Sequence, residues 1–318
     1  MELTSMGRLD LAMKMVMKDL AVFTDTFNFC RINGNKIDPS RLREMDTSVC
    51  MVEALSGDVH SQTSDLAKRL VICGDESRTC ALLLLENQAY VDLLMPLRCL
   101  YATALHLREE ADIIRKRHKI EHDLKDTDAF LSGFSPIDRL PHVYTLILYA
   151  GKKPWNGPLR LSELLTEEDA GCGLYEADCR LNLISLVDLS AAEIARFTTN
   201  EMKVMATAIQ LQDDPLQLLE VAQTNPAFID LDAEMYNVVQ LTSGFELPPP
   251  THPKGNDIKK DLTAVKEILR KEGAEEKSAT IVANMLMKKC PLAMIEDYIQ
   301  ISRDKILQIA KANNIPIL

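Results

Sequence analysis

Two acidic residues stand where a pair of predicted strands would bring them together. The runs 66–73 and 79–88 are short and apolar, and the polar residues between them are typical of a β-hairpin turn. A turn centred between residues 75 and 76 pairs positions whose numbers sum to 151, so Asp65 is expected opposite Glu86. Opposed side chains lie about 5 Å apart, and two like charges there repel each other. A divalent cation bound by both carboxylates would offset this repulsion, and Mg²⁺ or Mn²⁺ prefers such oxygen ligands.

Gln88 is expected beside this acidic pair, because side chains alternate along a strand and residues 86 and 88 then share a face. Asn87 points away from that face and could offer only its backbone carbonyl to a metal. Three polar groups would therefore converge at one end of a very apolar strand. A strand end at which Asp65 and Glu86 simply meet water fits the same spacing, so both interpretations stay open.

The segments around these residues predict an α/β protein in which helices cover a mixed sheet. The run 81–85 consists of one Ala and four Leu, so it does not alternate and is expected to be a central strand with both faces covered. The remaining elements follow from helical spacing and from β-rich apolar runs. They are a first helix over 9–29, an irregular connection over 40–63, a helix over about 96–124, a strand over 142–150 and a further strand over 181–187.

The C-terminal part of the chain is expected to be helical. Residues 190–242 have helical patterns, and a stretch with four prolines in nine residues, 247–255, is typical of a stiff extended linker. Beyond it, 11 Lys plus Arg and 9 Asp plus Glu accompany short predicted helices, which cover 258–271, 279–289, 292–299 and 303–312. The sequence thus predicts a main domain over 1–246 with its core at about 8–190, a linker over 247–256 and a helical tail over 257–318.

The composition excludes several classes of protein. The chain has 318 residues, of which 47% are hydrophobic and 26% charged, as expected of a globular protein with a large core. A net charge of -11 argues against a generally basic nucleic-acid coat protein, so contact with DNA would have to be local. No stretch reaches about 18 uncharged apolar residues, and the eight cysteines include no CxxC pair. We therefore expect a cytoplasmic protein with reduced thiols and no membrane partner.

Five stretches of the chain, taken in order, resemble one known family. They are VFTDTFNF (22–29), SDLAKRL (64–70), LLLLENQAYVDLLMPLRCLYATAL (82–105), FLSGF (130–134) and LPHVYTLILYAGKKPWNGPLRLSELL (140–165). The family is that of the transposase-type, recombination-promoting nucleases in the PD-(D/E)XK nuclease superfamily, and the resemblance covers about residues 15–245. It implies a restriction-endonuclease-like mixed sheet flanked by helices, which hydrolyses DNA phosphodiesters with Mg²⁺ or Mn²⁺. The C-terminal helices resemble the variable all-helical extension of these proteins.

Position by position, the resemblance assigns roles to the residues of the hairpin. Asp65 matches the first acidic residue of the superfamily and Glu86 the second, and both would bind the metal. Gln88 stands where the superfamily usually has Lys, although the family itself often has Gln there. Gln88 would position the attacking water, while the cation would lower the pKa of that water and neutralise charge on the phosphate. Ser64 replaces an Arg that relatives often carry before the Asp.

Two residues of the next helix are expected to support this cluster. Arg98 and Tyr101 are three apart, so they share a helical face that can turn toward Glu86, and in the family a similar pair follows the E-x-Q strand. We expect Arg98 and Tyr101 to support the acidic residues or to contact phosphate. An ordinary first turn of a helix is the alternative interpretation.

Basic residues elsewhere could form a local positive surface for a phosphate backbone. Arg115 and Lys116 lie in a charged part of the long predicted helix, and Lys152 and Lys153 follow the third strand. The resemblance to a nuclease makes these four residues candidates for DNA binding. Charge runs are more often solvated faces, which is the alternative here.

Two short motifs give competing hypotheses. Residues 118–122 spell H-x-x-E-H, the inverted zinc-protease pattern, but the many charges around them are more typical of a solvated helix end. Residues 292–313 have the length of a helix-turn-helix, whereas their Leu, Ile and Met residues favour a packed bundle or a homo-oligomer formed through the tail. The competing hypothesis for the whole chain is a catalytically inactive nuclease-fold protein that acts as an interaction or assembly module.

Overall fold

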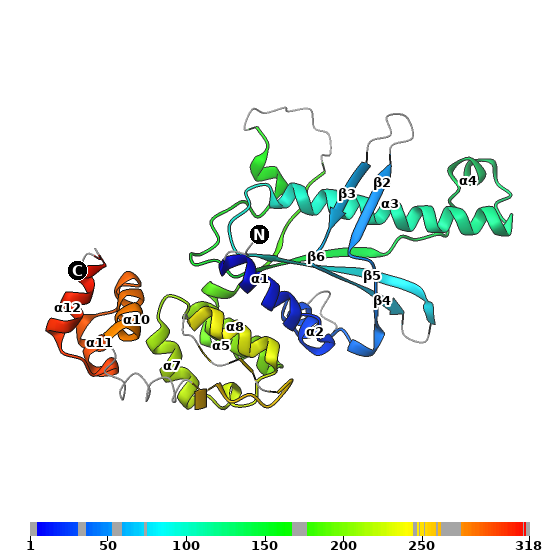
Figure 1. Cartoon of the computed structure of the whole chain (residues 1–318). Helices are drawn as coiled ribbons and strands as arrows, with labels where there is room; N and C mark the ends of the chain where they lie inside the picture. Colours follow the sequence, from blue (N-terminus) through cyan, green and yellow to red (C-terminus); the bar gives the residue numbers. More distant parts are fainter. Residues whose placement is uncertain are drawn as a thin grey trace. The chain divides into compact units, whose positions relative to one another are not determined.

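The chain forms two compact units. The computed structural model describes residues 5–30, 36–52, 59–72, 75–166, 177–243, 247–261 without 248, 251 and 259, 275–313 and 315 (Figure 1). One unit comprises Met1–Asp25 and Leu186–Leu318, and the other comprises Thr26–Ser185. This division does not coincide with the boundary predicted at 247–256, so the linker stays a prediction.

The unit Thr26–Ser185 contains a five-stranded sheet in the order β1-β4-β5-β6-β7. The strands are β1 (Leu42–Glu44), β4 (Leu66–Ile72), β5 (Asp75–Gln88), β6 (His142–Tyr149) and β7 (Asn182–Ser185). Strands β1, β4 and β5 pair antiparallel, whereas β5, β6 and β7 pair parallel. The expectation of an α/β protein with a mixed sheet flanked by helices is confirmed.

Strand β5 is the middle strand because its apolar run is covered on both faces. Residues 81–85 are at most 4% exposed, as the absence of alternation predicted. The neighbouring strand β6 contributes Leu146, Ile147 and Leu148, which are also buried. A polar residue at the end of such a strand is therefore held in position by the core that precedes it.

The predicted register of the hairpin is confirmed along most of β4. Leu66 pairs with Leu85 and Leu70 with Ala81, so partner numbers sum to 151. Toward the turn the register shifts, and Ile72 pairs with Asp75. Cys73 and Gly74, and with them the expected pair of Cys73 and Arg78, lie outside the described residues.

The prediction of an irregular connection over 40–63 was wrong. Besides β1, this segment contains β2 (Ser48–Val52) and β3 (Val59–Thr63), which pair antiparallel with Ser48 opposite Thr63. Val and Thr favour an extended backbone, and the ladder satisfies the backbone polar groups whatever the polarity of the side chains. The polar composition that suggested a loop therefore did not decide the structure.

The single helix predicted over 9–29 is two helices, α1 (Ser5–Val16) and α2 (Leu20–Phe29). Asp19 explains the break, because its carboxylate Oδ1 accepts hydrogen bonds from the backbone N–H groups of Ala21 (2.7 Å) and Val22 (3.2 Å). A side chain that satisfies these donors starts a new helix at that point.

Helix α3 (Met95–Glu121) crosses from β5 to β6 and continues past the sheet, where it meets the short helix α4 (Thr127–Ser132) (Figure 1). Pro96 occupies its first turn, where a missing N–H costs nothing, and His122 ends it in the left-handed conformation with φ 50°. The helix predicted over 96–124 is thereby confirmed. Its two ends lie in very different surroundings.

The other unit is helical. Its elements are α1, α5 (Ala191–Ile194), α6 (Asn200–Gln210), α7 (Pro215–Thr224), α8 (Ala233–Ser243), α10 (Glu275–Met287), α11 (Leu292–Ile299) and α12 (Arg303–Ala312). The Asp25 carboxylate accepts hydrogen bonds from the backbone N–H groups of Thr198 and Thr199, at 2.8 Å each, and so ties α2 to the start of α6. The last two predicted helices are confirmed residue for residue. Among the described residues, no helix is both long and apolar enough to cross a membrane.

Candidate functional site

Several of the residues singled out by the sequence lie where β5 and β6 end and α3 begins. Because β5 and β6 are parallel, with Gln88 opposite Tyr149, their carboxyl ends meet at one edge of the sheet. Alternation places Glu86 and Gln88 on the same face as Ile147 of β6. Ile147 packs in one apolar cluster with Met95 and Cys99 of α3, so this is the face that the helix covers.

Asp65 is bound to the backbone of the residue that follows Glu86. It directly precedes Leu66, the first residue of β4, whose partner on β5 is Leu85, so the same register continued by one residue would bring Asp65 level with Glu86. The Asp65 carboxylate Oδ2 accepts a hydrogen bond from the backbone N–H of Asn87 at 2.8 Å. Glu86 itself is only 6% exposed. The Asp65 carboxylate is thus fixed by the backbone of β5, one residue along the strand from the buried Glu86.

Arg98 supplies the positive charge at this site. Its Nη1 lies 2.6 Å from Oδ2 of Asp92, and its Nη2 lies 3.9 Å from Oε2 of Glu86. Burial lowers the pKa of Arg98, but the hydrogen bond to Asp92 and the charges of Asp92 and Glu86 outweigh burial and raise it. The guanidinium is therefore permanently charged and held between a loop carboxylate and a strand carboxylate.

A small cavity adjoins Glu86 under the first turns of α3. Its volume is about 10 Å³, which is room for about one water molecule, and its lining includes Glu86, Arg98 and Thr145. Thr145 is 7% exposed and its hydroxyl has no hydrogen-bond partner. A buried hydroxyl without a partner is costly, so a water in this cavity would bridge polar groups.

Cys99 also lines this cavity but is not a reactive thiol. Burial, followed by the nearby Cys179, raises the pKa of Cys99 to about 12. The thiol is therefore protonated at neutral pH and is neither a nucleophile nor a metal ligand in this arrangement.

Gln88 is placed as predicted, with its side chain on the face of Glu86. It is 8% exposed, and its backbone carbonyl accepts the N–H of Ala150 at 2.8 Å, which extends the β5–β6 ladder. The backbone of Gln88 is thereby fixed at the last position before the chain leaves the sheet.

The loop after β6 presents Lys152 and Lys153 at this same edge, and both are exposed. The Tyr149 hydroxyl donates a hydrogen bond to the carbonyl of Lys153 at 2.9 Å, and the Tyr149 ring meets Trp155 edge to face at 5.2 Å. A Cβ on Gly151 would lie 2.1 Å from the Tyr149 hydroxyl, so only glycine fits there. Aromatic packing thus shapes the loop and leaves the lysines at the surface.

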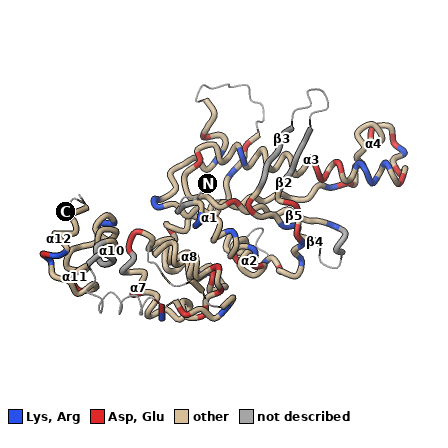
Figure 2. The backbone as a smooth tube through the Cα atoms, in the orientation of Figure 1, with Lys and Arg blue, Asp and Glu red and all other residues tan. Residues whose placement is uncertain are grey.

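The other predicted residues do not join this cluster. Tyr101 is 37% exposed and does not line the cavity beside Glu86, where Ala102 lies instead. Arg115 and Lys116 are about 25 Å farther along α3 than Arg98, at a rise of about 1.5 Å per residue. Arg115 Nη1 there pairs with Asp112 Oδ1 at 3.0 Å. Figure 2 shows acidic and basic residues interspersed along this part of α3 rather than a continuous basic surface.

Sequence reasoning missed Asp92 and Thr145. Asp92 carried a signal, since an Asp shortly before a Pro-containing first turn is typical of a helix start, and its Oδ1 accepts the N–H of Leu94 at 2.9 Å. Thr145 is the one small polar residue in the middle of the apolar run 142–150, on the face shared with Glu86. The pairing of Asp92 with Arg98 had no signal in the spacing alone.

The acidic pair fits a divalent cation only in part. Asp65 and Glu86 supply the oxygen ligands that Mg²⁺ and Mn²⁺ prefer, and water or a substrate phosphate commonly completes such a site. Among the described residues, however, the only group of three potential ligands drawn from His, Cys, Asp and Glu is His118, Glu121 and Asp123. A cation at the strand edge would therefore rest on two carboxylates of this chain.

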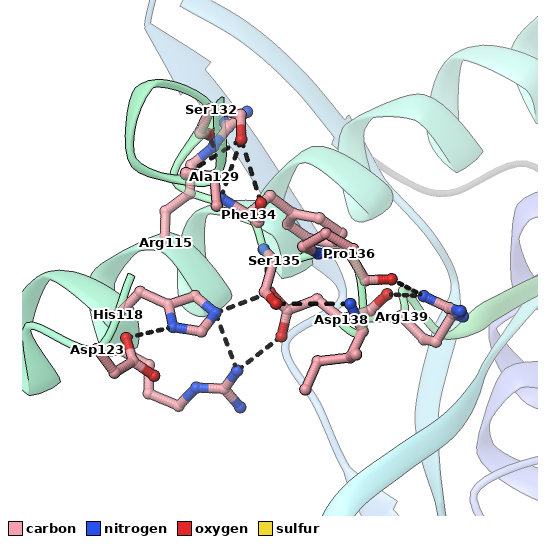
Figure 3. Close-up of polar contacts among 12 residues, drawn as sticks. Arg115, His118, Asp123, Ala129, Ser132, Phe134, Ser135, Pro136, Asp138 and Arg139 are labelled. Carbon is pink, nitrogen blue, oxygen red and sulfur yellow. Dashed lines mark hydrogen bonds and ion pairs between the residues drawn. The ribbon is translucent and has the colours of Figure 1, made fainter. Parts of the chain in front are cut away.

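The H-x-x-E-H motif lies at an exposed helix end, as expected of a solvated one, except that His118 is buried, and its two histidines do not fall in one group of potential metal ligands among the described residues. His118 is 7% exposed, and its two ring nitrogens lie 2.7 Å from Asp123 Oδ1 and from Asp138 Oδ2 (Figure 3). Hydrogen bonds to Asp123 and then Asp138 outweigh burial and raise the pKa of His118. Both nitrogens are occupied by carboxylates, and His122 terminates the helix in a left-handed conformation.

Comparisons with known proteins found no matching family model, no matching curated protein and no matching solved structure.

Proposed function

We propose that the chain is a Mg²⁺- or Mn²⁺-dependent DNA endonuclease with a restriction-endonuclease-like core and a C-terminal helical extension. The observation that supports this proposal most is the register of β4 and β5, which, continued by one residue beyond Leu66 and Leu85, would set Asp65 opposite Glu86. Gln88 shares the face of Glu86, as the expected arrangement of acid, acid and amide requires. DNA as partner, a cytoplasmic location and self-association through the helical tail are further parts of the proposal.

In this proposal Asp65 and Glu86 hold the metal, and each other residue has a separate task. The metal, when bound, lowers the pKa of a coordinated water and neutralises charge that develops on the phosphate. Gln88 orients the attacking water by hydrogen bonding, since an amide cannot take up its proton at neutral pH. Arg98, held by Asp92, keeps the buried Glu86 in place.

Exposed lysines are proposed to contact the DNA. Lys152 and Lys153 lie at the sheet edge where Gln88 ends, so a phosphate backbone bound there would pass close to the acidic pair. Arg115 is paired with Asp112, which makes it a weaker candidate for DNA binding, while Lys116 is exposed on the same helix. We therefore place the main DNA contact at the loop after β6.

The test is nicking of supercoiled plasmid DNA in Mg²⁺ and in Mn²⁺. Asp65→Asn and Glu86→Gln remove one negative charge each with little change in shape, and Asp112→Asn is the matched control on an exposed carboxylate. We expect the wild type and the control to nick DNA, and both site variants to lose nearly all activity. Equal nicking by wild type and both site variants would overturn the proposal.

A second candidate function is that of a catalytically inactive interaction module. It is favoured by the hydrogen bond from the Asn87 N–H to Asp65, because a carboxylate that closes a backbone ladder has a structural use without any metal. In that case neither the wild type nor Asp65→Asn, which keeps an acceptor oxygen, binds a metal ion. Calorimetric titration of Mn²⁺ into the wild type separates the two candidates.

A further inference from the structure

A second site lies at the far end of α3. Between the last turns of α3 and helix α4 is an open cleft of about 790 Å³. Its lining combines basic side chains, Arg115, Lys119 and His122, with apolar ones, Leu124, Phe130 and Leu131. The volume is within the range of about 300 to 1,000 Å³ that is usual for small-molecule sites. No carboxylate lines this cleft among the described residues.

Hydrogen bonds hold the walls of the cleft in place. Asp126 caps α4, since its Oδ2 accepts the backbone N–H groups of Asp128 (3.0 Å) and Ala129 (3.1 Å). Arg115 Nε donates a hydrogen bond to the carbonyl of Ser132 at 3.2 Å and so joins the two helices (Figure 3). A preformed site does not have to be ordered when a ligand arrives, which favours binding.

The apolar side chains of α4 are turned outward. Ala129, the smallest of them, is 6% exposed, whereas Phe130 and Leu131 are 71% and 78% exposed. If folding alone decided the orientation of this capped helix, burial of Phe130 or Leu131 instead of Ala129 would stabilise it more. Adjacent exposed apolar residues of this kind mark a surface for binding.

The charge at the cleft is positive and partly available. Arg115 uses Nε and Nη1 within the chain, and Lys119 and His122 are exposed. His118 also lines the cleft, but its two ring nitrogens already lie against Asp123 and Asp138. Arg117 pairs with Asp138 at 2.9 Å and is not part of the lining.

We propose that this cleft binds a small amphiphilic anion, an acyl or aryl carboxylate. Its apolar body packs against Phe130 and Leu131, and its carboxylate meets the ammonium of Lys119 and the remaining nitrogen of Arg115. Apolar and cationic groups side by side recognise this chemistry and discriminate against neutral or cationic amphiphiles of the same length. The proposal does not depend on the nuclease reaction.

Isothermal titration calorimetry of decanoate into the full chain tests the proposal. We expect a dissociation constant on the order of 100 μM or tighter. Acetate, which lacks the apolar body, and decanol, which lacks the charge, should each bind at least tenfold more weakly. Equal affinity for decanoate and decanol, or no binding of decanoate, would overturn the proposal.

Surface variants locate the binding. Lys119→Met and Phe130→Ser should each weaken decanoate binding about tenfold, which corresponds to about 1.4 kcal/mol. Lys116→Met removes a charge from the same helix and Ile137→Ser an exposed apolar side chain, and neither residue lines the cleft. Both control variants should bind decanoate like the wild type. If a control loses as much affinity as the cleft variants, binding is not in this cleft and the proposal is wrong.

Discussion

Cationic side chains contact carboxylates at both ends of α3, yet the two ends are built differently. At the first end, Arg98 joins Asp92 of a loop to Glu86 of a central strand, and Asp65, which precedes another strand, accepts the backbone N–H of the neighbouring Asn87. At the far end, the carboxylates that Arg117 and His118 contact belong to the adjacent segment 123–138. Charges gathered from distant segments require the whole sheet, whereas charges gathered locally require one helix and the turn after it.

The largest difference between the two ends is expected in activity. Glu86→Gln should reduce plasmid nicking by about 100-fold or more, because a metal bound as proposed would lose one of its two protein ligands. Asp138→Asn removes a carboxylate of similar burial at the far end and should leave nicking within about twofold of wild type. Initial nicking rates in Mg²⁺ measure both. An equal loss in the two variants would mean that the acidic pair has no special role.

The next contrast concerns stability. Arg98→Met leaves Glu86 and Asp92 without their cation, and because Arg98 is 37% exposed we expect a loss of about 2 kcal/mol, below that of a fully buried pair. Arg117→Met removes a 51% exposed arginine and should cost less than about 1 kcal/mol. Urea unfolding of both variants measures the free energies. A larger loss for Arg117→Met would contradict the comparison.

Replacing a glycine should also cost more stability beside the first end of α3 than at its far end. Gly151→Ala places a Cβ 2.1 Å from the hydroxyl of buried Tyr149 and should cost about 2 to 3 kcal/mol by forcing the ring to move. Gly133→Ala places a residue with φ 67° beside the flexible Arg115 side chain and should cost about 1 kcal/mol. Thermal unfolding ranks the two variants, and the reverse order would show that Tyr149 can adjust.

The smallest effect is one of pH on two histidines of α3. His118 has a raised pKa, so its stabilising contacts are fully present below about pH 6.5 and are lost as pH rises through the raised value. His106 is 1% exposed without a partner for either ring nitrogen, and burial lowers its pKa, so it destabilises the fold as pH falls below about 6.5. Glu110 and Arg69 are the charges that face His106.

Nuclear magnetic resonance titration of the two imidazoles measures this contrast directly. We expect His118 to titrate above about pH 6.5 and His106 below it. Asp138→Asn should move the titration of His118 down while leaving that of His106 unchanged. If the two histidines had the same titration midpoint, the hydrogen bonds to Asp123 and Asp138 would not raise the pKa of His118.

Much of the sheet and of the tail could be predicted from the sequence because the signals are local. The non-alternating run 81–85 identified a doubly covered strand, and the turn between two apolar runs predicted the register that pairs Leu66 with Leu85 and Leu70 with Ala81. Proline and serine at helix starts marked α11 and α12. Periodicity and capping depend on residues a few positions apart, which a sequence displays directly.

Other features could not be predicted because their partners are distant or their signals compete. The polar segment 48–63 became a hairpin through ladder hydrogen bonds that its composition does not reveal. Asp19 split an apolar helix pattern by capping, against the periodicity on both sides. Tyr101 shares a helical spacing with Arg98 but turns to solvent, because Ala102 faces the cavity instead.

By itself, the sequence determined the α/β class, the central hairpin and the alternation that sets Glu86 and Gln88 on one face. Only the tertiary structure decided that Arg98 joins Asp92 to Glu86, that Thr145 closes a cavity beside them, and that His118 lies between two aspartates. Pairing along a strand is fixed by neighbours in the chain, but a charge finds its partner only after packing has brought separate segments together and excluded water between them.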